Sequence, residues 1–372
     1  MIMGSILFSI GISVGFLLIM GLVLAALLIL AEKKILNYGT CCIDINEGEK
    51  KLEVPGGGSL LSSLAENNIF IPSACGGRGT CAYCKVQVME GGSMIGPVEE
   101  PYLGPEDRKN QIRLSCQVKV RKDIRISVPK ELLSVRKYKG KLLHKRPLTY
   151  DIVELRIELL EPKTIDFVVG QYVQLESEEY NRNDRVMRAY SMSSPPSDKN
   201  HIELMIRKVP HGICTTWVFE HLKEGQEVAL SGPYGKFRLS NTNAEIIFIA
   251  GGSGMAPIWG MLRDLKEKGN TRKATYFFGA LTQKDLFLVD DLTRLQQEVP
   301  WFKFIPALSN EPANSDWKGE RGLITDIVAR HMPDCSKNEG YLCGSPGMID
   351  ACVKVLTKAG MAEDRIFYDK FV

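Results

Sequence analysis

Residues 245–257, EIIFIAGGSGMAP, are the stretch that decides the fold of this chain. Glu245 to Ala250 has the composition of a strand buried in a parallel sheet, and a glycine-rich turn and a helix follow it. Glycines let phosphate groups approach the backbone closely, and the free N–H groups at the start of a helix attract anions. The stretch therefore predicts a dinucleotide site formed by Gly251, Gly252, Gly254, Met255, Ala256 and Pro257.

Residues 240–372 as a whole alternate apolar strands with amphipathic helices. The segments ATYFFGA, FKFIPALS and EGYLCGSP each precede a helical or loop stretch, which predicts a doubly wound parallel sheet. Cys343 ends the last of these strands at the carboxyl edge, where such sheets bind ligands. A cysteine is commonly just a small buried side chain. This position instead favours a catalytic role for Cys343 beside the coenzyme, with Gly344 and Pro346 as further contacts.

The residues after Gly279-Ala280 bear on the choice between NADH and NADPH. A 2′-phosphate needs a basic side chain to hold it. Lys284 is the only cation close to this strand end, where Leu281, Thr282 and Gln283 come first. The composition of this turn favours NADH.

Residues 130–239 contain many short strands separated by glycine and proline, which predicts a small antiparallel barrel. Within it, Arg188-Ala189-Tyr190-Ser191 combines groups that a flavin uses. Arg188 can pair with a pyrophosphate, Tyr190 can lie against the isoalloxazine ring, and Ser191 can hydrogen-bond near its N5 atom. A second pyrophosphate contact is predicted where the helix WVFEHL begins, at Gly212, Cys214, Thr215 and Thr216.

A cysteine cluster lies in the stretch SACGGRGTCAYC at residues 73–84. The spacing is C-x5-C-x2-C, and a fourth cysteine follows in RLSCQV, so that four thiolates are available for an iron–sulfur cluster of two irons. Zinc sites with four cysteines usually show two C-x2-C pairs, whereas only one is present here. The sequence therefore predicts a [2Fe–2S] cluster held by Cys75, Cys81, Cys84 and Cys116.

These motifs carry family resemblances. The cysteine spacing resembles that of the [2Fe–2S] ferredoxins, which implies a β-grasp domain over residues 36–129. RAYS, together with GPYG at 232–235, resembles the FAD domain of the ferredoxin–NADP reductase superfamily. CGSP resembles the C-G-x-P motif of that superfamily, whose cysteine lies near the nicotinamide C4 atom. The last residues resemble its terminal aromatic, which covers the flavin until nicotinamide displaces it, and this role is carried over to Phe371.

Gly4 to Ala31 contains no charged residue. This is longer than the roughly 20 residues that a membrane-spanning helix needs. A cleaved signal peptide is the alternative, but it would have a basic N-terminal region and a shorter apolar core of about 7–15 residues. Because Lys33 and Lys34 follow the run, the expected topology is a single-pass anchor in the cell inner membrane, with its N-terminus outside and later domains cytoplasmic.

The overall composition excludes other classes of protein. The chain has 372 residues, of which 44% are apolar and 24% charged, with a net charge of +3. Such a balance argues against nucleic-acid binding, and ten cysteines are too few for a disulfide scaffold. The expected organisation is multidomain α+β and α/β: an anchor at 1–35, the ferredoxin domain at 36–129, the FAD barrel at 130–239 and the NAD sheet at 240–372.

The order of these modules resembles the family of NADH-oxidising F subunits of the sodium-translocating NADH:quinone reductase. Further matches are GG-S-GMAP and the stretch Asn310 to Trp317, whereas CGSP and the ending DKFV depart from the family pattern. The resemblance implies an enzyme that passes a hydride from NADH to FAD, then single electrons through the cluster to membrane subunits of a hetero-oligomer and to quinone or another acceptor. The alternatives are the reductase component of an oxygenase, an NADH-dependent reductase of another membrane acceptor, and a redox sensor without catalytic activity.

Overall fold

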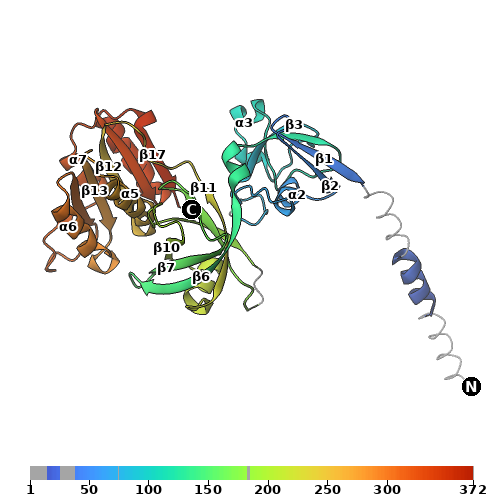
Figure 1. Ribbon diagram of the computed structural model, residues 1–372, viewed down its shortest axis with the longest axis horizontal. Helices are drawn as coiled ribbons and strands as arrows, with labels where there is room; N and C mark the ends of the chain where they lie inside the picture. The colour runs from blue at the N-terminus through green and yellow to red at the C-terminus, as the bar shows by residue number, and fades with distance from the viewer. Residues whose placement is uncertain (1–14, 26–37, 74, 182–184, 372) are drawn as a thin grey trace, which may run out of the picture. The chain divides into compact units, whose positions relative to one another are not determined.

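The computed structural model describes residues 15–25, 38–73, 75–181 and 185–371 (Figure 1). The chain divides into two compact units, one of residues 1–71 and 77–133 and the other of residues 72–76 and 134–372. Residues 15–25 are helical and expose large apolar side chains, including Phe16 (66%) and Leu22 (72%). Most of the predicted membrane anchor lies outside the described residues. Within the described ranges, no helix combines the length and the apolar character that crossing a bilayer requires.

The first unit is built on a mixed five-stranded sheet. Alternation of apolar and polar residues in β1 buries Cys41, Ile43 and Ile45 against the helix side of the sheet, where α2 begins at Leu60. The N-cap of α2 is Ser59, whose hydroxyl accepts a hydrogen bond from Ser62 N. The sheet order is β2 (Lys50–Pro55), β1 (Thr40–Ile45), β5 (Ile124–Ser127), β3 (Lys85–Glu90) and β4 (Ile112–Leu114). After residue 38, the described helices of this unit are α2 (Leu60–Glu66), α3 (Pro105–Lys109) and two 3-10 turns at Glu100–Tyr102 and Lys130–Ser134.

The second unit begins with an antiparallel barrel. Its sheet order is β10 (His201–Arg207), β7 (Ile152–Glu161), β6 (Arg136–Pro147), β11 (Glu227–Tyr234), β8 (Tyr172–Glu176) and β9 (Met187–Ser191). A single bridge between Met192, just after β9, and Leu204 of β10 links the two outer strands, so the sheet curls round into a barrel-like form. One helix crosses the barrel, α4 (Ile213–Thr216), and continues into a π-helical turn at Trp217–His221. The expectation of an antiparallel, barrel-like sheet is confirmed.

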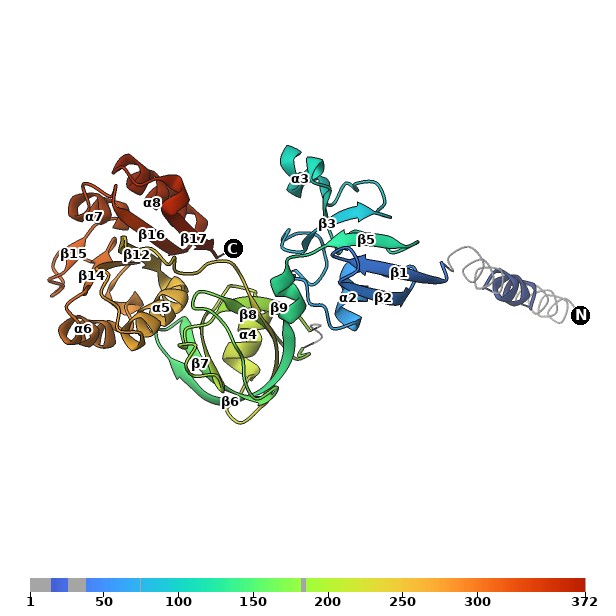
Figure 2. The same cartoon turned by 45° about the horizontal axis from the view of Figure 1, so that its top comes forward.

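The remainder of this unit is a parallel sheet between two layers of helices. Its order is β15 (Glu320–Arg321), β14 (Phe302–Leu308), β13 (Ala274–Ala280), β12 (Glu245–Gly251), β16 (Asn338–Gly344) and β17 (Ile366–Lys370). Helices α5 (Met255–Glu267) and α6 (Val289–Glu298) cover one face, and α7 (Ile324–His331) and α8 (Pro346–Lys358) cover the other (Figure 2). Successive residues of β12 enter opposite cores, Ile247 beside α7 and α8 and Phe248 beside α5, so the strand is apolar throughout.

Glu339 holds the amino end of this parallel sheet together and is only 2% exposed. Its carboxylate accepts hydrogen bonds from three parts of the chain: the segment before β12, the segment before β13, and β16 itself. It accepts hydrogen bonds from Ser240 Oγ (2.6 Å), Thr242 Oγ1 (2.6 Å), Tyr341 OH (2.9 Å) and Arg272 Nη2 (2.8 Å). A buried carboxylate is stabilised only when charges and donors of this kind surround it.

Replacing Glu339 with alanine should therefore lower the free energy of unfolding by about 3 kcal/mol, because Arg272 would remain buried without its counter-ion. The measurement is denaturant unfolding of the full chain followed by tryptophan fluorescence. Glu245→Ala is the matched control, since Glu245 pairs with Lys273 at the same end of the sheet but in solvent, and it should cost less than about 1 kcal/mol. Equal losses for the two variants would contradict the role given to Glu339.

Candidate functional site

The carboxyl edge of the parallel sheet brings the glycine-rich turn and Cys343 together. Strands β12 and β16 are neighbours, and the strand order reverses between them, so a crevice is expected where their carboxyl ends diverge. A Cβ atom built on Gly254 would lie 2.3 Å from Cys343 O and 3.0 Å from Gly344 N. The turn therefore packs directly against the backbone that follows β16, and only glycine fits at position 254.

The turn meets the requirements of a dinucleotide phosphate site. Gly252 has a φ of +55°, which lets the backbone bend into the 3-10 turn before α5. Among the described residues no side chain caps the start of α5, so this helix end is open to an anion, although Met255 N itself donates to Gly252 O. A Cβ atom on Gly252 would lie 3.3 Å from Arg207 Nη1, so a cation from the barrel lies beside the turn. Sequence reasoning missed Arg207, which Asp151 orients through a 2.6 Å hydrogen bond.

Asp369 joins the barrel to the parallel sheet and is another residue that sequence reasoning missed. It pairs with Cys343 in the register of β16 and β17, and its Oδ2 is 3.5 Å from Ser191 Oγ at the end of β9. Burial raises the pKa of Asp369 to about 6, against the opposing effect of the Ser191 hydroxyl. Cys343 is fully buried, and its pKa is raised well above the ordinary value by burial and then by Asp369. Ser191 and Cys343, two of the residues predicted to be catalytic, thus both lie beside the carboxylate of Asp369.

The predicted terminal aromatic lies at the same place. Phe371 N donates a 2.9 Å hydrogen bond to Gly344 O, and the partly buried ring packs against the core that contains Cys343. The last described residues are also held by Lys370, whose ammonium group is 2.7 Å from Asp350 Oδ1. Ser191, Cys343 and Phe371 are therefore brought to one edge of the sheet.

The predicted flavin residues lie along β9 and at the start of α4. Tyr190 is hydrogen-bonded to Cys214, and burial and then this neighbour raise its pKa well above the ordinary value. Cys214 is 1% exposed, and burial raises its pKa to about 11, so it positions Tyr190 as a neutral thiol. Arg188 Nη1 donates a hydrogen bond to Met187 O at 2.8 Å. Ala189, which lies between Arg188 and Tyr190 in the sequence, is exposed.

The start of α4 is a tight turn built around Gly212. A Cβ atom there would lie 2.6 Å from Thr215 Oγ1. The Thr215 hydroxyl is engaged locally, because it accepts from Val209 N at 3.2 Å and lies 3.2 Å from Gly212 O. Thr216 N donates to Gly212 O at 2.8 Å, which begins the helical hydrogen-bonding pattern. The opposite end of this helix is held by Lys145 Nζ, which donates to three carbonyls, those of Val218, Phe219 and Leu222.

The cysteine loop at residues 75–84 has a backbone that suits an iron–sulfur cluster. Gly76, Gly77 and Gly79 have φ values of +65°, +86° and +80°, conformations that aim successive N–H groups into a concave loop. Two predicted ligands, Cys84 and Cys116, are buried with their sulfurs 3.4 Å apart. Gln117 Nε2 lies 3.4 Å from Cys116 Sγ and can donate to a thiolate there. Cys75 and Cys81 are half-buried on the loop itself.

Within the described ranges, no group of three or more histidine, cysteine, aspartate or glutamate side chains is gathered as a metal site. The assignment of all four cysteines as ligands therefore remains a prediction. The bent glycine loop, the buried sulfur pair and the amide donor of Gln117 fit a cluster of sulfide-bridged irons.

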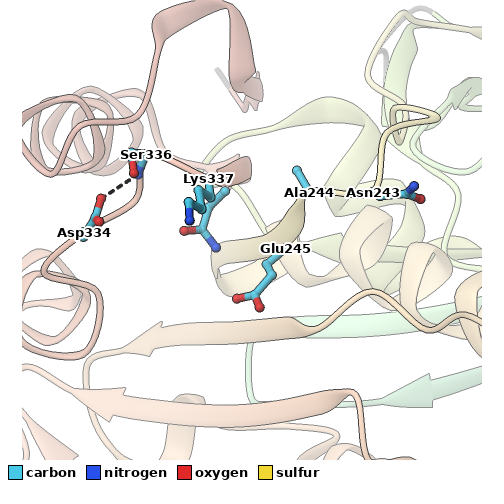
Figure 3. Close-up of a pocket in the computed structure, with 7 residues that line it drawn as sticks. Asn243, Ala244, Glu245, Asp334, Ser336 and Lys337 are labelled. Atoms are coloured by element: carbon cyan, nitrogen blue, oxygen red, sulfur yellow. Dashed lines mark hydrogen bonds between the residues drawn. The ribbon is translucent and has the colours of Figure 1, made fainter.

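One open pocket, of about 420 Å³, lies away from these residues. Its lining comes from the amino ends of β12 and β16 and the loop before β16, and Figure 3 shows these residues, with the hydrogen bond between Ser336 N and Asp334. The lining residues are Asn243, Ala244, Glu245, Asp334, Ser336, Lys337 and Asn338. Because parallel sheets bind ligands at their carboxyl ends, this pocket is not the dinucleotide site.

Comparisons with known proteins agree with this geometry. Three family models match: the 2Fe-2S iron-sulfur cluster binding domain at residues 39–121, the oxidoreductase FAD-binding domain at 139–239 and the oxidoreductase NAD-binding domain at 248–354. Among solved structures, the chain is similar to an Amycolatopsis cytochrome P450 reductase (28% identity, TM-score 0.73, covering 89% of this chain and 99% of that one). It is also similar to the ferredoxin reductase in carbazole 1,9a-dioxygenase (26%, TM-score 0.69, covering 90% and 99%). Fold and site thus define an iron–sulfur flavoprotein oxidoreductase that uses a nicotinamide coenzyme.

Curated relatives are more similar in sequence and match over nearly the whole chain. The F subunit of the Na(+)-translocating NADH-quinone reductase of Pseudomonas aeruginosa is 35% identical, covering 98% of this chain and 99% of the relative. The corresponding protein of Neisseria meningitidis is 34% identical, covering 94% and 96%. The chain belongs to the family of F subunits of the Na(+)-translocating NADH-quinone reductase.

The contact between Gly254 and Cys343 gives a direct test of the dinucleotide turn. Gly254→Ala should weaken NADH binding at least tenfold, because the added methyl group must push the turn away from Cys343 O. The measurement is the dissociation constant of NADH from fluorescence titration. Gly347→Ala is the matched control, since a Cβ atom there meets no atom within 4 Å, and it should bind NADH normally. Normal binding by the Gly254 variant would rule out the proposed turn.

Proposed function

We propose that this chain oxidises NADH and delivers the electrons singly to a membrane-bound redox partner of an NADH:quinone reductase complex. The observation that supports this most directly is the meeting of Ser191, Asp369 and Cys343 where the barrel and the parallel sheet join. When bound, FAD accepts a hydride from NADH and releases electrons one at a time, and a [2Fe–2S] cluster transfers one electron at a time.

Different residues of the chain would bind the flavin pyrophosphate, the flavin ring and the reacting end of the site. Arg188, the start of α4 at Gly212, and Thr216 would hold the flavin pyrophosphate, and Tyr190, fixed by Cys214, would lie along the ring. Ser191 would hydrogen-bond near the flavin N5 atom. Asp369 holds the Ser191 hydroxyl and lies beside Cys343, so it orients both residues at the reacting end of the site.

The dinucleotide is assigned to the turn after β12. The positive end of the α5 dipole and the Arg207 guanidinium would face its pyrophosphate, with Ala256 and Pro257 forming the first turn of the helix. Gly344 and Pro346 would line the nicotinamide end beside Cys343. Phe371, held at Gly344 by its backbone, would cover the flavin until nicotinamide takes its place.

The protein is assigned to the inner membrane. The charge-free run from Gly4 to Ala31 and the lysines that follow it support a single-pass anchor with the redox domains on the cytoplasmic side. The names of the relatives support quinone as the final acceptor and the other subunits of such a complex as partners.

The similarity to a cytochrome P450 reductase and a dioxygenase reductase favours a second candidate, the reductase component of an oxygenase. Purification of the full chain in detergent separates the two. Co-purifying integral membrane subunits support the quinone reductase, whereas a co-purifying hydroxylase would support the oxygenase reductase.

The order of carriers can be tested by removing the cluster alone. Cys81→Ala should abolish NADH-dependent reduction of quinone by the complex, because three thiolates do not hold the cluster. Reduction of ferricyanide at the flavin should stay within about twofold of the wild-type rate. Iron and FAD contents are measured in parallel, and Cys42→Ala is the control that should keep both activities. Loss of both activities in a variant that still binds FAD would contradict the proposed order.

The raised pKa of Asp369 predicts a pH dependence. Below a pH of about 6 the carboxyl group is neutral, and above it the ionised form stabilises positive charge developing on the nicotinamide beside Cys343. The rate of flavin reduction by NADH in stopped flow should therefore rise as the pH increases through about 6. In the Asp369→Asn variant, the rate of flavin reduction should not change between pH 5 and 8, and at pH 7.5 it should be roughly tenfold lower than in the wild type.

Asp334→Asn is the control for this measurement, because Asp334 is an exposed aspartate beside the opposite, amino end of β16. It should keep the wild-type pH profile. An unchanged profile in the Asp369 variant would show that another group titrates.

A further inference from the structure

A second set of side chains lies at the carboxyl edge of the parallel sheet, on the far side of β12 from Cys343. Strands β13 and β14 are parallel neighbours, and the register pairs Gly279 with Gly251 on one side and with Ala307 on the other. The residues after β13 and β14 therefore emerge at the same edge as the phosphate turn. In a sheet of this kind, the end of the second strand faces the adenosine ribose of the dinucleotide.

Two carboxylates converge on Gln283, in the turn that follows β13. Gln283 N donates to Glu311 Oε2 at 2.9 Å, and its Nε2 donates to Glu311 Oε1 and to Asp316 Oδ1, each also at 2.9 Å. These hydrogen bonds, from the side chain first and then the backbone, lower the pKa of Glu311, so this carboxylate is ionised at neutral pH.

The loop that supplies both carboxylates is fixed in place. Ser309 N and Asn310 N donate to the carbonyls of Ala280 and Leu281, which ties the beginning of the loop to the end of β13. Further along, Arg321 clamps the loop with its guanidinium. It donates to Glu311 O (3.1 Å), Pro312 O (3.0 Å), Ser315 Oγ (2.9 Å) and Trp317 O (3.2 Å). The carboxylates are therefore held at the strand end before any ligand arrives.

The charge at this position opposes an added phosphate. Asp285, in the same turn, contributes a third carboxylate, which accepts from Thr282 and from Tyr150 OH. The exposed Lys284 is the one cation of the turn, and Arg321 keeps its charge beside Glu311, so three carboxylates stand against two cations. Arg207, which lies near Asp285, is paired with Asp151. A phosphate monoester carries about 1.5 to 2 negative charges at neutral pH. Such a group would meet net negative charge here, whereas a ribose hydroxyl can donate a hydrogen bond to a carboxylate.

We propose that Glu311 and Asp316, held against Gln283, are the specificity-determining residues that select NADH and reject the 2′-phosphate of NADPH. This inference rests on the proposed function, because it assigns the coenzyme preference to the same dinucleotide site. The discriminating carboxylates come from the loop after β14.

The test uses the full chain with Glu311→Gln and Asp316→Asn combined, which removes two negative charges while keeping polar side chains of the same size. Calorimetry gives the dissociation constants of ADP-ribose and 2′-phospho-ADP-ribose, a binding measurement that needs no turnover. The ratio of kcat/KM for NADH and NADPH is measured with ferricyanide. Glu363→Gln with Asp364→Asn is the matched control, because these adjacent exposed acidic residues precede β17 at the opposite edge of the sheet.

The double variant should bind 2′-phospho-ADP-ribose at least tenfold more tightly than the wild type, and its kcat/KM for NADPH should rise by a similar factor. Binding of ADP-ribose and kcat/KM for NADH should change less than about threefold, and the control pair should leave all four values unchanged. In the wild type, raising the salt concentration from 20 to 500 mM should narrow the preference for ADP-ribose, because exposed charges are screened.

The failure of this inference differs from the failure of the proposed function. The assignment of Glu311 and Asp316 would be overturned if the wild type oxidises NADH and the double variant prefers ADP-ribose over 2′-phospho-ADP-ribose as strongly as the wild type does. A salt-independent preference would also overturn it. A wild-type chain with bound FAD that does not oxidise NADH would instead overturn the proposed function.

Discussion

The contact of the turn after β12 with the backbone after β16 is the constraint on which the rest of the site depends. Gly254 lies so close to Cys343 O that no side chain fits between them. This contact aligns the start of α5 with the strand end that bears Cys343, so the candidate phosphate site and the buried thiol share one edge of the sheet. A shift of the turn would move the phosphate site relative to the reacting end of the coenzyme.

Polar side chains also connect the barrel and the sheet. Asp369 reaches Ser191 from β17, Arg207 reaches the glycine turn from β10, and Tyr150 OH donates to Asp285 at 2.9 Å. Each of these contacts places a polar group of one domain at a strand end of the other. These polar contacts add to an apolar interface, in which Ile152, Met205 and Phe237 of the barrel segment join the core of the sheet, and they leave charged groups at the mouth of the site.

Many residues of the candidate site could be predicted because local chemistry restricts them. Glycine at a positive φ or at a close approach, as at Gly252 and Gly254, and cysteines at a fixed spacing are visible along the chain. Asp369 could not be found in this way, because its raised pKa arises from burial beside Ser191, which is far away in sequence. Gln117 was missed because an isolated polar residue resembles any other surface residue. Glu311 and Asp316 were noted only as part of the stretch Asn310 to Trp317, and their contacts with Gln283 are visible only in the structure.

The sequence by itself determined the kinds of modules and their order, because strand periodicity, glycine turns and cysteine spacing are properties of short segments. It also determined that the turn after β13 offers little positive charge, with only Lys284 nearby. The tertiary structure decided which polar groups meet. It links the outer strands of the barrel through Met192 and Leu204, brings Asp369 to Ser191, and folds Glu311 and Asp316 back onto Gln283. The physical reason is that hydrogen bonds and Coulomb interactions depend on distance in space, and only the packing of the sheets sets that distance.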